Sequence, residues 1–276
     1  MEIIIGLDIG GSTTKVVGFQ GNELLDVTYV RASDPVAAAY GAIGKFLNIN
    51  NLKLEDIKQI RMTGVGSSYM TQNFLEIETV ISSEFEAVGL GGLYISQMEE
   101  AIVVSIGTGT SFVYSNQEKT EHIIGSGVGG GSILGLSNRM FHFRDFELIS
   151  NLADQGELSH VDLLVKDISK TVPGLSGNAT ASNFGNVNDN AQAKDLAAGV
   201  VNMVFQSIGT MAVLCARNHN VKDIVFVGSV VHIAQGQRSL QQFAELYDVN
   251  VILPDNARFS TAIGAALSNN YKKLNQ

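Results

Sequence analysis

Two stretches of the sequence each run from an apolar, β-branched segment into a short series of glycine and hydroxyl residues. The first is GLDIGGSTTK at residues 6–15, and the second is VVSIGTGTS at residues 103–111. Consecutive backbone amides in a turn without bulky side chains form a concave site that binds anions such as phosphate. The repetition predicts that the two turns face each other and hold the phosphates of a nucleotide between them.

The first turn is accompanied by one acidic and one basic side chain. Asp8 stands at the end of the apolar segment, and Lys15 follows the turn. A carboxylate repels phosphate but suits Mg²⁺, which it can bind directly or through water, so Asp8 is the predicted metal ligand. The alternative is an ordinary hairpin turn with a surface aspartate. The predicted phosphate contacts of this turn are Gly10, Gly11, Ser12, Thr13, Thr14 and Lys15.

The second turn is predicted to hold phosphate without a metal. Ser105 takes the position of Asp8, and the hydroxyls of Thr108 and Ser111 can donate hydrogen bonds. A third glycine run, GVGGGS at residues 127–132, leads into a helical pattern, so its amides are expected at a helix N-terminus, where anions bind favourably. The alternatives are hydroxyls that only stabilise a turn and glycines that let a helix cross closely over a strand.

A candidate general base lies in the segment SSEFEA. Glu84 and Glu86 stand at the start of a predicted helix, two residues apart and therefore on different faces. One of the two carboxylates should point into the cleft between the turns. There it can accept the proton of a bound alcohol during phosphoryl transfer. Alternatively, both residues only stabilise the helix N-terminus through its dipole.

The elements that position these residues form the same series twice. Strand–turn–strand patterns at residues 2–19 and 100–115 each open a mixed segment of strands and helices. A duplicated α/β fold with a cleft between its halves explains this repetition. We predict one domain over residues 1–98 and a second over residues 99–276.

Three further segments carry clear signals. Asp34 and Pro35 have the residue types of a helix N-cap and first helical position. Residues 193–220 form the longest helical pattern, whereas residues 173–192 lack periodicity and are predicted to be a loop near a site. The segment DIVFVGSVV at residues 223–231 is predicted to be a buried strand that ends in a glycine turn.

The composition excludes several classes of function. The chain has 276 residues, of which 45% are hydrophobic and 16% charged, so it can bury a large core and is not mainly disordered. Its net charge of −9 disfavours nucleic acid as a partner. The single cysteine, Cys215, excludes an internal disulfide, and no apolar run approaches the roughly 20 residues that span a bilayer. We therefore expect a cytoplasmic protein without a membrane partner.

Five segments, taken together, resemble the type II pantothenate kinases in the same order and over nearly the whole chain. They are GLDIGGSTTK, VVSIGTGTS, GSGVGGGSILGL, ASNFGN and IVFVGSVV. The first of them alone indicates only the larger superfamily of actin, sugar kinases and heat-shock chaperone ATPases. The resemblance implies an α/β fold of two duplicated ribonuclease-H-like domains with a nucleotide cleft between them.

The resemblance also implies an activity and a set of site residues. The activity is ATP-dependent phosphorylation of the primary hydroxyl of pantothenate, the first step of coenzyme A synthesis, with Mg²⁺ and in a homodimer. Glu84 matches the base of the family, while Thr108 and Ser111 match residues that bind substrate. The implied nucleotide contacts, besides Asp8–Lys15, are Thr108, Gly130, Gly131, Ser132, Ile133, Leu134, Phe146 and Ser229.

One position departs from the family pattern. The family places an arginine that contacts substrate three residues before its GTGxGGG-like run, which begins at Gly125 here, and this chain has His122 at that position. Imidazole carries a charge only below about pH 6.5 and cannot form the bidentate hydrogen bonds of a guanidinium. Either His122 binds the substrate less strongly, or Arg139 or Arg144 replaces the missing cation, or the substrate differs.

Three other functions compete with the kinase hypothesis. The ATPase activators of hydroxyacyl-CoA dehydratases open with a similar motif, but they hold an iron–sulfur cluster through two cysteines per subunit, and this chain has only Cys215. A kinase for a sugar such as N-acetylglucosamine is the second alternative. The third is a non-catalytic relative that binds ATP or coenzyme A, which His122 favours and which Glu84 and Asp8 oppose.

Overall fold

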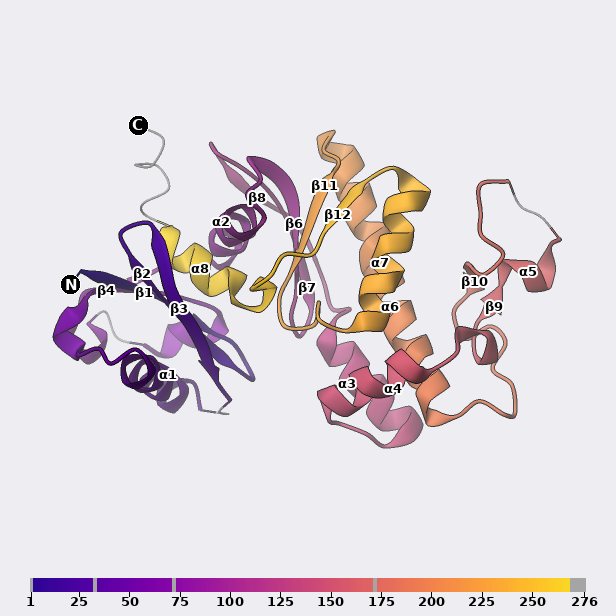
Figure 1. Cartoon of the computed structure of the whole chain (residues 1–276), viewed down its shortest axis with the longest axis horizontal. Coiled ribbons are helices and arrows are strands. Elements are labelled where there is room, and N and C mark those ends of the chain that lie inside the picture. Colours follow the sequence, from indigo (N-terminus) through magenta and orange to yellow (C-terminus); the bar gives the residue numbers. More distant parts are fainter. Residues whose placement is uncertain (1, 32–33, 71–72, 171–172, 269–276) are drawn as a thin grey trace.

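The computed structural model describes residues 2–31, 34–70, 73–170 and 173–268, which form two five-stranded sheets side by side (Figure 1). The first sheet has the order β3-β2-β1-β4-β5, in which β1, β2 and β3 are antiparallel neighbours and β4 and β5 run parallel to β1. Its strands are β1 (Ile3–Ile9), β2 (Thr14–Gln20), β3 (Glu23–Val30), β4 (Ile57–Thr63) and β5 (Thr79–Ile81).

The second sheet repeats this topology. Its order is β12-β11-β6-β7-β8, again with three antiparallel strands followed by two parallel ones. Its strands are β6 (Glu100–Ile106), β7 (Thr110–Asn116), β8 (Thr120–Ser126), β11 (Asp223–Val227) and β12 (Asn250–Ile252). The predicted duplication of an α/β fold is therefore confirmed.

Two helices lie between the sheets, and each of them packs on the sheet formed by the other half of the chain; we call them the exchanged helices. Helix α2 (Glu84–Ser96) precedes the second sheet and packs on it through Val88 and Leu93. Helix α8 (Ser260–Leu267) ends the second half but packs on the first sheet, against Val17 and Phe19. A cut at residue 98 would consequently separate α8 from the sheet that it covers. The division at this residue stays a proposal.

The remaining long helices cover the outer faces of the sheets (Figure 1). Helix α1 (Pro35–Ile49) packs on the first sheet, and the carboxylate of Asp34 accepts a hydrogen bond from the Ala37 amide, as expected of an N-cap. The second sheet is covered by helices from the second half of the chain. These are α6 (Ala193–His219) and α7 (Ala234–Tyr247), while α3 (Gly130–Phe141) and α4 (Phe146–Gln155) pack on α6.

Helix α6 is long and apolar enough to cross a membrane by length and composition. Residues 196–216 include polar side chains such as Asn202 and Gln206 but no charged one, so the expectation that no apolar run approaches the length of a membrane span is wrong for this helix. Within this structure 67% of its most apolar window is buried, which is typical of the core helix of a globular protein. Its predicted apolar stripe lies in the core through Val200, Val204 and Ile208.

Residues 156–192 project beyond α6 as a separate arm (Figure 1). The arm contains β9 (Leu163–Leu164), α5 (Val165–Ile168) and β10 (Thr180–Ser182), so the predicted loop includes a short strand. Buried Asp162 connects the arm to α6, because it accepts hydrogen bonds from Thr180, the Phe184 amide and Asn202. One of the 3₁₀ helices, Leu158–His160, also belongs to the arm. The others among the described residues are Leu54–Asp56, Val65–Tyr69, Phe74–Glu76 and Ala257–Phe259.

Candidate active site

The first turn joins β1 to β2 and places Asp8 opposite Lys15 in the strand register. Lys15 Nζ lies 2.9 Å from Asp8 Oδ2, and both side chains are largely buried. The Gly10 amide donates to the Thr13 carbonyl at 3.1 Å, which closes the turn, and Gly11 and Ser12 are exposed at its tip. The turn thus presents exposed backbone beside a carboxylate whose charge is balanced by a lysine.

A second glycine turn, which follows β4, contacts Asp8 from the other side. Gly64 has φ +87°, and a Cβ at this position would lie 2.7 Å from Asp8 Oδ1. Only glycine therefore allows this backbone conformation and this approach. Residue 64 was not among the predicted site residues, although the sequence TGVG at residues 63–66 indicates a glycine turn after a strand, as in the two predicted phosphate turns.

Glu84 is the first residue of α2 and lies within electrostatic reach of Asp8 and Lys15. Partial desolvation and the negative charge of Asp8 raise the pKa of the Glu84 carboxyl, while Lys15 lowers it. The side chain nevertheless remains exposed to solvent. An exposed carboxylate with a raised pKa beside the first turn has the properties of a general base. Glu86, two residues on, is also exposed.

The second turn, between β6 and β7, packs directly against the start of α3. The Gly130 amide donates to the Gly107 carbonyl at 2.9 Å, and the Gly131 amide donates to the Thr108 carbonyl at 2.8 Å. A Cβ at Gly129 would lie 2.8 Å from the Thr108 carbonyl oxygen. In this structure the glycines therefore serve close packing, which was the alternative interpretation. Phosphate contacts through the Gly130 and Gly131 amides stay a prediction that requires these two bonds to open.

The other residues predicted to bind nucleotide or substrate in the second half of the chain have the following places. The hydroxyl of Ser132 donates to the Gly127 carbonyl, and Ile133 is buried, while Leu134 is partly buried. Ser111 is partly buried in β7. Phe146, at the start of α4, packs on the second core.

The turn after β11 joins the same cluster. Gly228 has φ +101°, and a Cβ there would lie 2.4 Å from the Ile106 carbonyl oxygen. The Val230 amide donates to that same carbonyl at 3.3 Å. Ser229, the residue predicted near adenosine, is partly buried between these two contacts. Segments far apart in sequence, at residues 106–110, 127–132 and 228–230, thus meet at one place.

His122 contacts the residue that follows the candidate base in the sequence. Its ring stacks on the Phe85 ring with a centroid distance of 3.8 Å and an interplanar angle of 20°. Phe85 directly follows Glu84, so the stack connects β8 to the first turn of α2. Arg139 and Arg144 lie at and beyond the C-terminal end of α3, the end opposite the glycine run. The position that departs from the family pattern therefore contacts the residue that follows Glu84.

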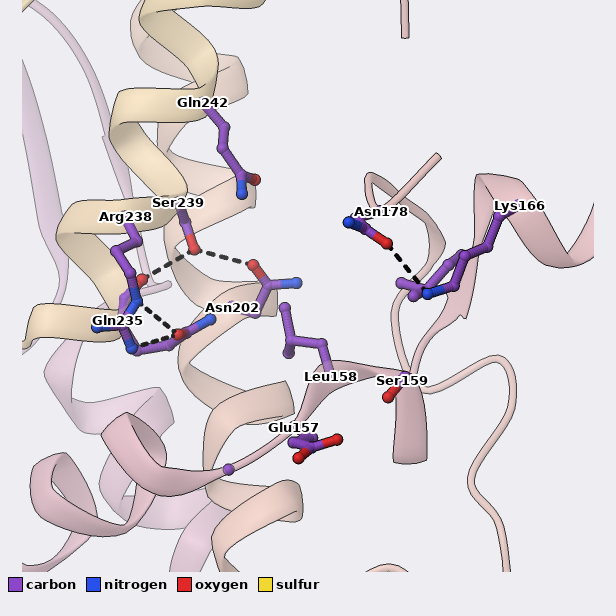
Figure 2. A pocket seen from close by; sticks show the side chains of 12 residues that line it. Glu157, Leu158, Ser159, Lys166, Asn178, Asn202, Gln235, Arg238, Ser239 and Gln242 are labelled. Carbon is purple, nitrogen blue, oxygen red and sulfur yellow. Dashed lines mark hydrogen bonds between the residues drawn. The ribbon is translucent and has the colours of Figure 1, made fainter. Parts of the chain in front are cut away.

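A cavity of about 380 Å³ lies elsewhere, between the arm, α6 and α7 (Figure 2). Its walls are mainly amide and hydroxyl side chains, among them Asn178, Asn202 and Ser239, and it contains none of the predicted site residues. The Ser239 hydroxyl donates to Asn202 at 2.9 Å on the wall formed by α6 and α7, and Lys166 donates to Asn178 at 3.0 Å on the wall formed by the arm (Figure 2). These polar groups already bond to one another.

The described residues contain no group of three or more His, Cys, Asp or Glu side chains that could hold a metal ion. A site with fewer protein ligands is compatible with Mg²⁺, which typically binds through one or two carboxylates together with waters and substrate phosphates. Asp8 is the carboxylate beside the first turn, and its role as a Mg²⁺ ligand stays a prediction. Cys215 is buried in α6 and its pKa is raised by burial, so it is a structural thiol.

The fold places the protein in a class of proteins with two duplicated α/β halves. The activator of 2-hydroxyisocaproyl-CoA dehydratase from Clostridium difficile, solved with bound ADPNP, superposes with a TM-score of 0.71 at 18% identity, over 99% of this chain and 97% of that chain. Component A of (R)-2-hydroxyglutaryl-CoA dehydratase from Acidaminococcus fermentans has a TM-score of 0.67, also at 18% identity, and both chains are covered fully. At this identity the likeness shows the fold.

Sequence comparison identifies the family. The Fumble family model matches residues 96–250. The type II pantothenate kinase of Staphylococcus haemolyticus is 32% identical over 96% of this chain and 99% of its own length. The chain belongs to the type II pantothenate kinase family, and the predicted resemblance is confirmed.

Proposed function

We propose that the protein transfers the γ-phosphoryl group of ATP to the primary hydroxyl of pantothenate, which is the first step of coenzyme A biosynthesis. Relatives that carry the name type II pantothenate kinase align over nearly the full chain. The observation that carries the proposal is the position of Glu84 beside Asp8 and Lys15 at the first turn. Base, metal ligand and cation are then in one place, as phosphoryl transfer requires.

Each group has a distinct part in the proposed reaction. The exposed backbone of residues 10–13 and the hydroxyls around Thr108 bind and orient the phosphates. Asp8 would hold Mg²⁺, which when bound neutralises charge on the phosphate oxygens. Lys15 adds a positive charge on the same side. Ser229 lies on the adenosine side of the second turn, next to Ile106.

Glu84 accepts the proton of the pantothenate hydroxyl as the oxygen attacks the γ-phosphorus. A base works best when its pKa approaches the operating pH, and the pKa of this carboxyl is raised by desolvation and by Asp8. The positive charge of Lys15 lowers the pKa of the same carboxyl and so limits the rise. Closure of the two lobes would exclude the water that otherwise competes with the alcohol.

The proposal extends to the domain division, the cellular location and the oligomeric state of the protein. We place the two domains at residues 1–98 and 99–276, the protein in the cytoplasm, and two copies in a homodimer formed through α6 and the arm. The exposed Leu214 on α6 and Val187 in the arm, at 60% and 50% accessibility, support a contact on this side of the molecule.

A coupled assay of ADP release tests the proposal. With pantothenate, pantetheine and N-acetylglucosamine as acceptors, pantothenate should be turned over most efficiently. The Glu84→Gln variant should bind ATP normally and lose about 10²- to 10⁴-fold in kcat, whereas Glu86→Gln should retain activity as the matched control. Preference for N-acetylglucosamine, or equal losses in both variants, would contradict the assignment.

A nucleotide-binding protein without turnover is the second candidate, and the Phe85–His122 stack favours it. This stack puts an imidazole where the family has an arginine. Nucleotide binding without release of ADP for any of the three acceptors would support this candidate over the kinase.

A further inference from the structure

Arg258 lies in the segment that links β12 to α8, within the 3₁₀ helix Ala257–Phe259. Its guanidinium sits over the ring of Tyr29, with its Cζ 5.3 Å from the ring centroid. The neighbouring Phe259 ring also packs near Tyr29, at a centroid distance of 6.5 Å. A residue from the second half of the chain is thereby placed on the last strand of the first hairpin.

Tyr29 belongs to the same row of side chains as the first turn. It pairs with Lys15 across β2 and β3, and Lys15 pairs with Asp8 across β1 and β2. Residues directly opposite on antiparallel strands point to the same face of the sheet. The three side chains therefore share the face that α8 covers, where a Cβ at Gly6 would lie 2.1 Å from the Ala262 carbonyl oxygen. This face is directed toward the second sheet (Figure 1).

The other side of the Arg258 segment contacts the turn that carries Ser229. The Gly228 amide donates to the Ala257 carbonyl at 2.9 Å. Burial and the positive charge of Arg258 lower the pKa of His232, which shows that the guanidinium lies near the end of this turn. Arg258 thus stands between the row of Asp8, Lys15 and Tyr29 on one lobe and the residues around Ser229 on the other.

Apart from the Tyr29 ring, the charge of Arg258 has no partner, and in particular no carboxylate, among the residues that the structure describes. Its Nε atom is buried without a hydrogen bond, and no carboxylate lies within ion-pair distance. Other arginines are compensated: Arg238 bonds Asp154 at 2.7 Å, and Arg61 bonds the Ala266 carbonyl at 2.6 Å. A partly buried guanidinium with free donors is costly unless an anion binds it, and its planar fork matches phosphate oxygens.

We infer that Arg258 binds the phosphate chain of the nucleotide, between the first turn and Ser229. This inference rests on the proposed function and adds a specific contact to it. The Tyr29 ring positions the guanidinium by packing against one of its faces, and the N–H groups of the guanidinium that lack a hydrogen bond donate to the nucleotide phosphates. Lys45, the other cation near the Tyr29 ring, donates instead to the Tyr29 carbonyl at 2.9 Å and is thereby occupied.

Calorimetric titration of the full chain with MgADP tests this contact. Loss of a charge-assisted hydrogen bond weakens binding by about tenfold to a hundredfold, so Arg258→Ala should raise the Kd for MgADP by that factor. Arg258→Lys should recover part of the loss because it keeps the charge. Arg217→Ala is the matched control, since Arg217 also covers a tyrosine ring, that of Tyr247 at 5.6 Å, but between α6 and α7.

The inference is overturned if Arg258→Ala binds MgADP within twofold of the wild type while its thermal unfolding is unchanged. If Arg258→Ala does not fold, Arg258→Gln, which retains most of the stem over Tyr29, takes its place, with the same criterion. Failure of the wild type itself to bind MgADP would instead overturn the proposed function, so the two failures are distinguishable.

Discussion

At the scale of single residues, Glu84 combines a chemical role with a cost in stability. Folding raises the pKa of its carboxyl through desolvation and the charge of Asp8. An acid with a raised pKa favours the folded state most at low pH, and this contribution is lost as the pH rises through the folded-state pKa. The ionised carboxylate that the reaction needs is therefore the form that the folded protein holds less favourably.

This conflict gives a pH-dependent prediction. The acidic limb of kcat/KM for pantothenate should lie above the ordinary pKa of a glutamate, because protonated Glu84 cannot accept a proton. Thermal unfolding at neutral pH should show Glu84→Gln to be at least as stable as the wild type. A limb at the ordinary glutamate pKa, or a clearly lower unfolding temperature of the variant, would contradict this account.

His122 makes a second prediction at this scale. His122→Arg restores a permanent cation next to Phe85, the residue that follows Glu84, and a cation that stabilises developing charge is worth about tenfold or more in turnover. We expect pantothenate turnover to rise accordingly. His122→Phe keeps a ring for the stack on Phe85 without any charge, so it separates packing from electrostatics. Unchanged or lower turnover of His122→Arg would count against a substrate contact at this position.

At the scale of elements, the crossing of α2 and α8 depends on two glycines. A Cβ at Gly91 would lie 1.8 Å from the Ser260 carbonyl oxygen, and one at Gly264 would lie 1.8 Å from the Ala87 carbonyl oxygen. Backbone atoms cannot move aside as a flexible side chain can. The GLGG and IGAA segments are therefore what permit the two exchanged helices to touch.

Substitution at this crossing should be strongly destabilising. Overpacking typically costs about 1–3 kcal/mol, and the backbone contact places Gly91→Ala at or above the upper end of this range. Gly44→Ala in α1 is the matched control, because nothing lies within 4 Å of its Cβ position. This control should gain about 0.5–1 kcal/mol through helix propensity. Denaturant unfolding of both variants measures the difference, and equal stabilities would refute the tight crossing.

Local signals in the sequence predicted most elements correctly, and the failures are all long-range. The cap at Asp34 and the hairpins around both turns follow from neighbouring residues. The pairing of β9 with β10 joins short segments 15 or more positions apart through Asp162, and no periodicity reports such contacts. The bonds from the Gly130 and Gly131 amides to the second turn were likewise invisible, because a glycine run reads the same whether its amides bind phosphate or protein.

At the scale of the whole molecule, the charge at the proposed site is opposite in sign to the net charge of the chain. The chain has a net charge of −9, yet Lys15 and Arg258 flank the site that is proposed to bind a triphosphate. Asp8 already balances Lys15 through their 2.9 Å ion pair, so Arg258 is the cation left for the ligand. An acidic protein can in this way bind an anion through a small local field, without the broad basic surface that nucleic acid requires.

The exchange of α2 and α8 makes the two lobes interdependent in folding. Without α8, the first sheet exposes Val17 and Phe19, which are buried in the whole chain. A fragment of residues 1–98 would also leave Val88 and Leu93 of α2 without their sheet. We therefore predict that this fragment shows no cooperative thermal transition by circular dichroism, and that the complete chain unfolds in a single step. A cooperative transition of the fragment alone would show that the first lobe folds without α8, and would make the exchanged helices a connection between independent domains instead of a shared core.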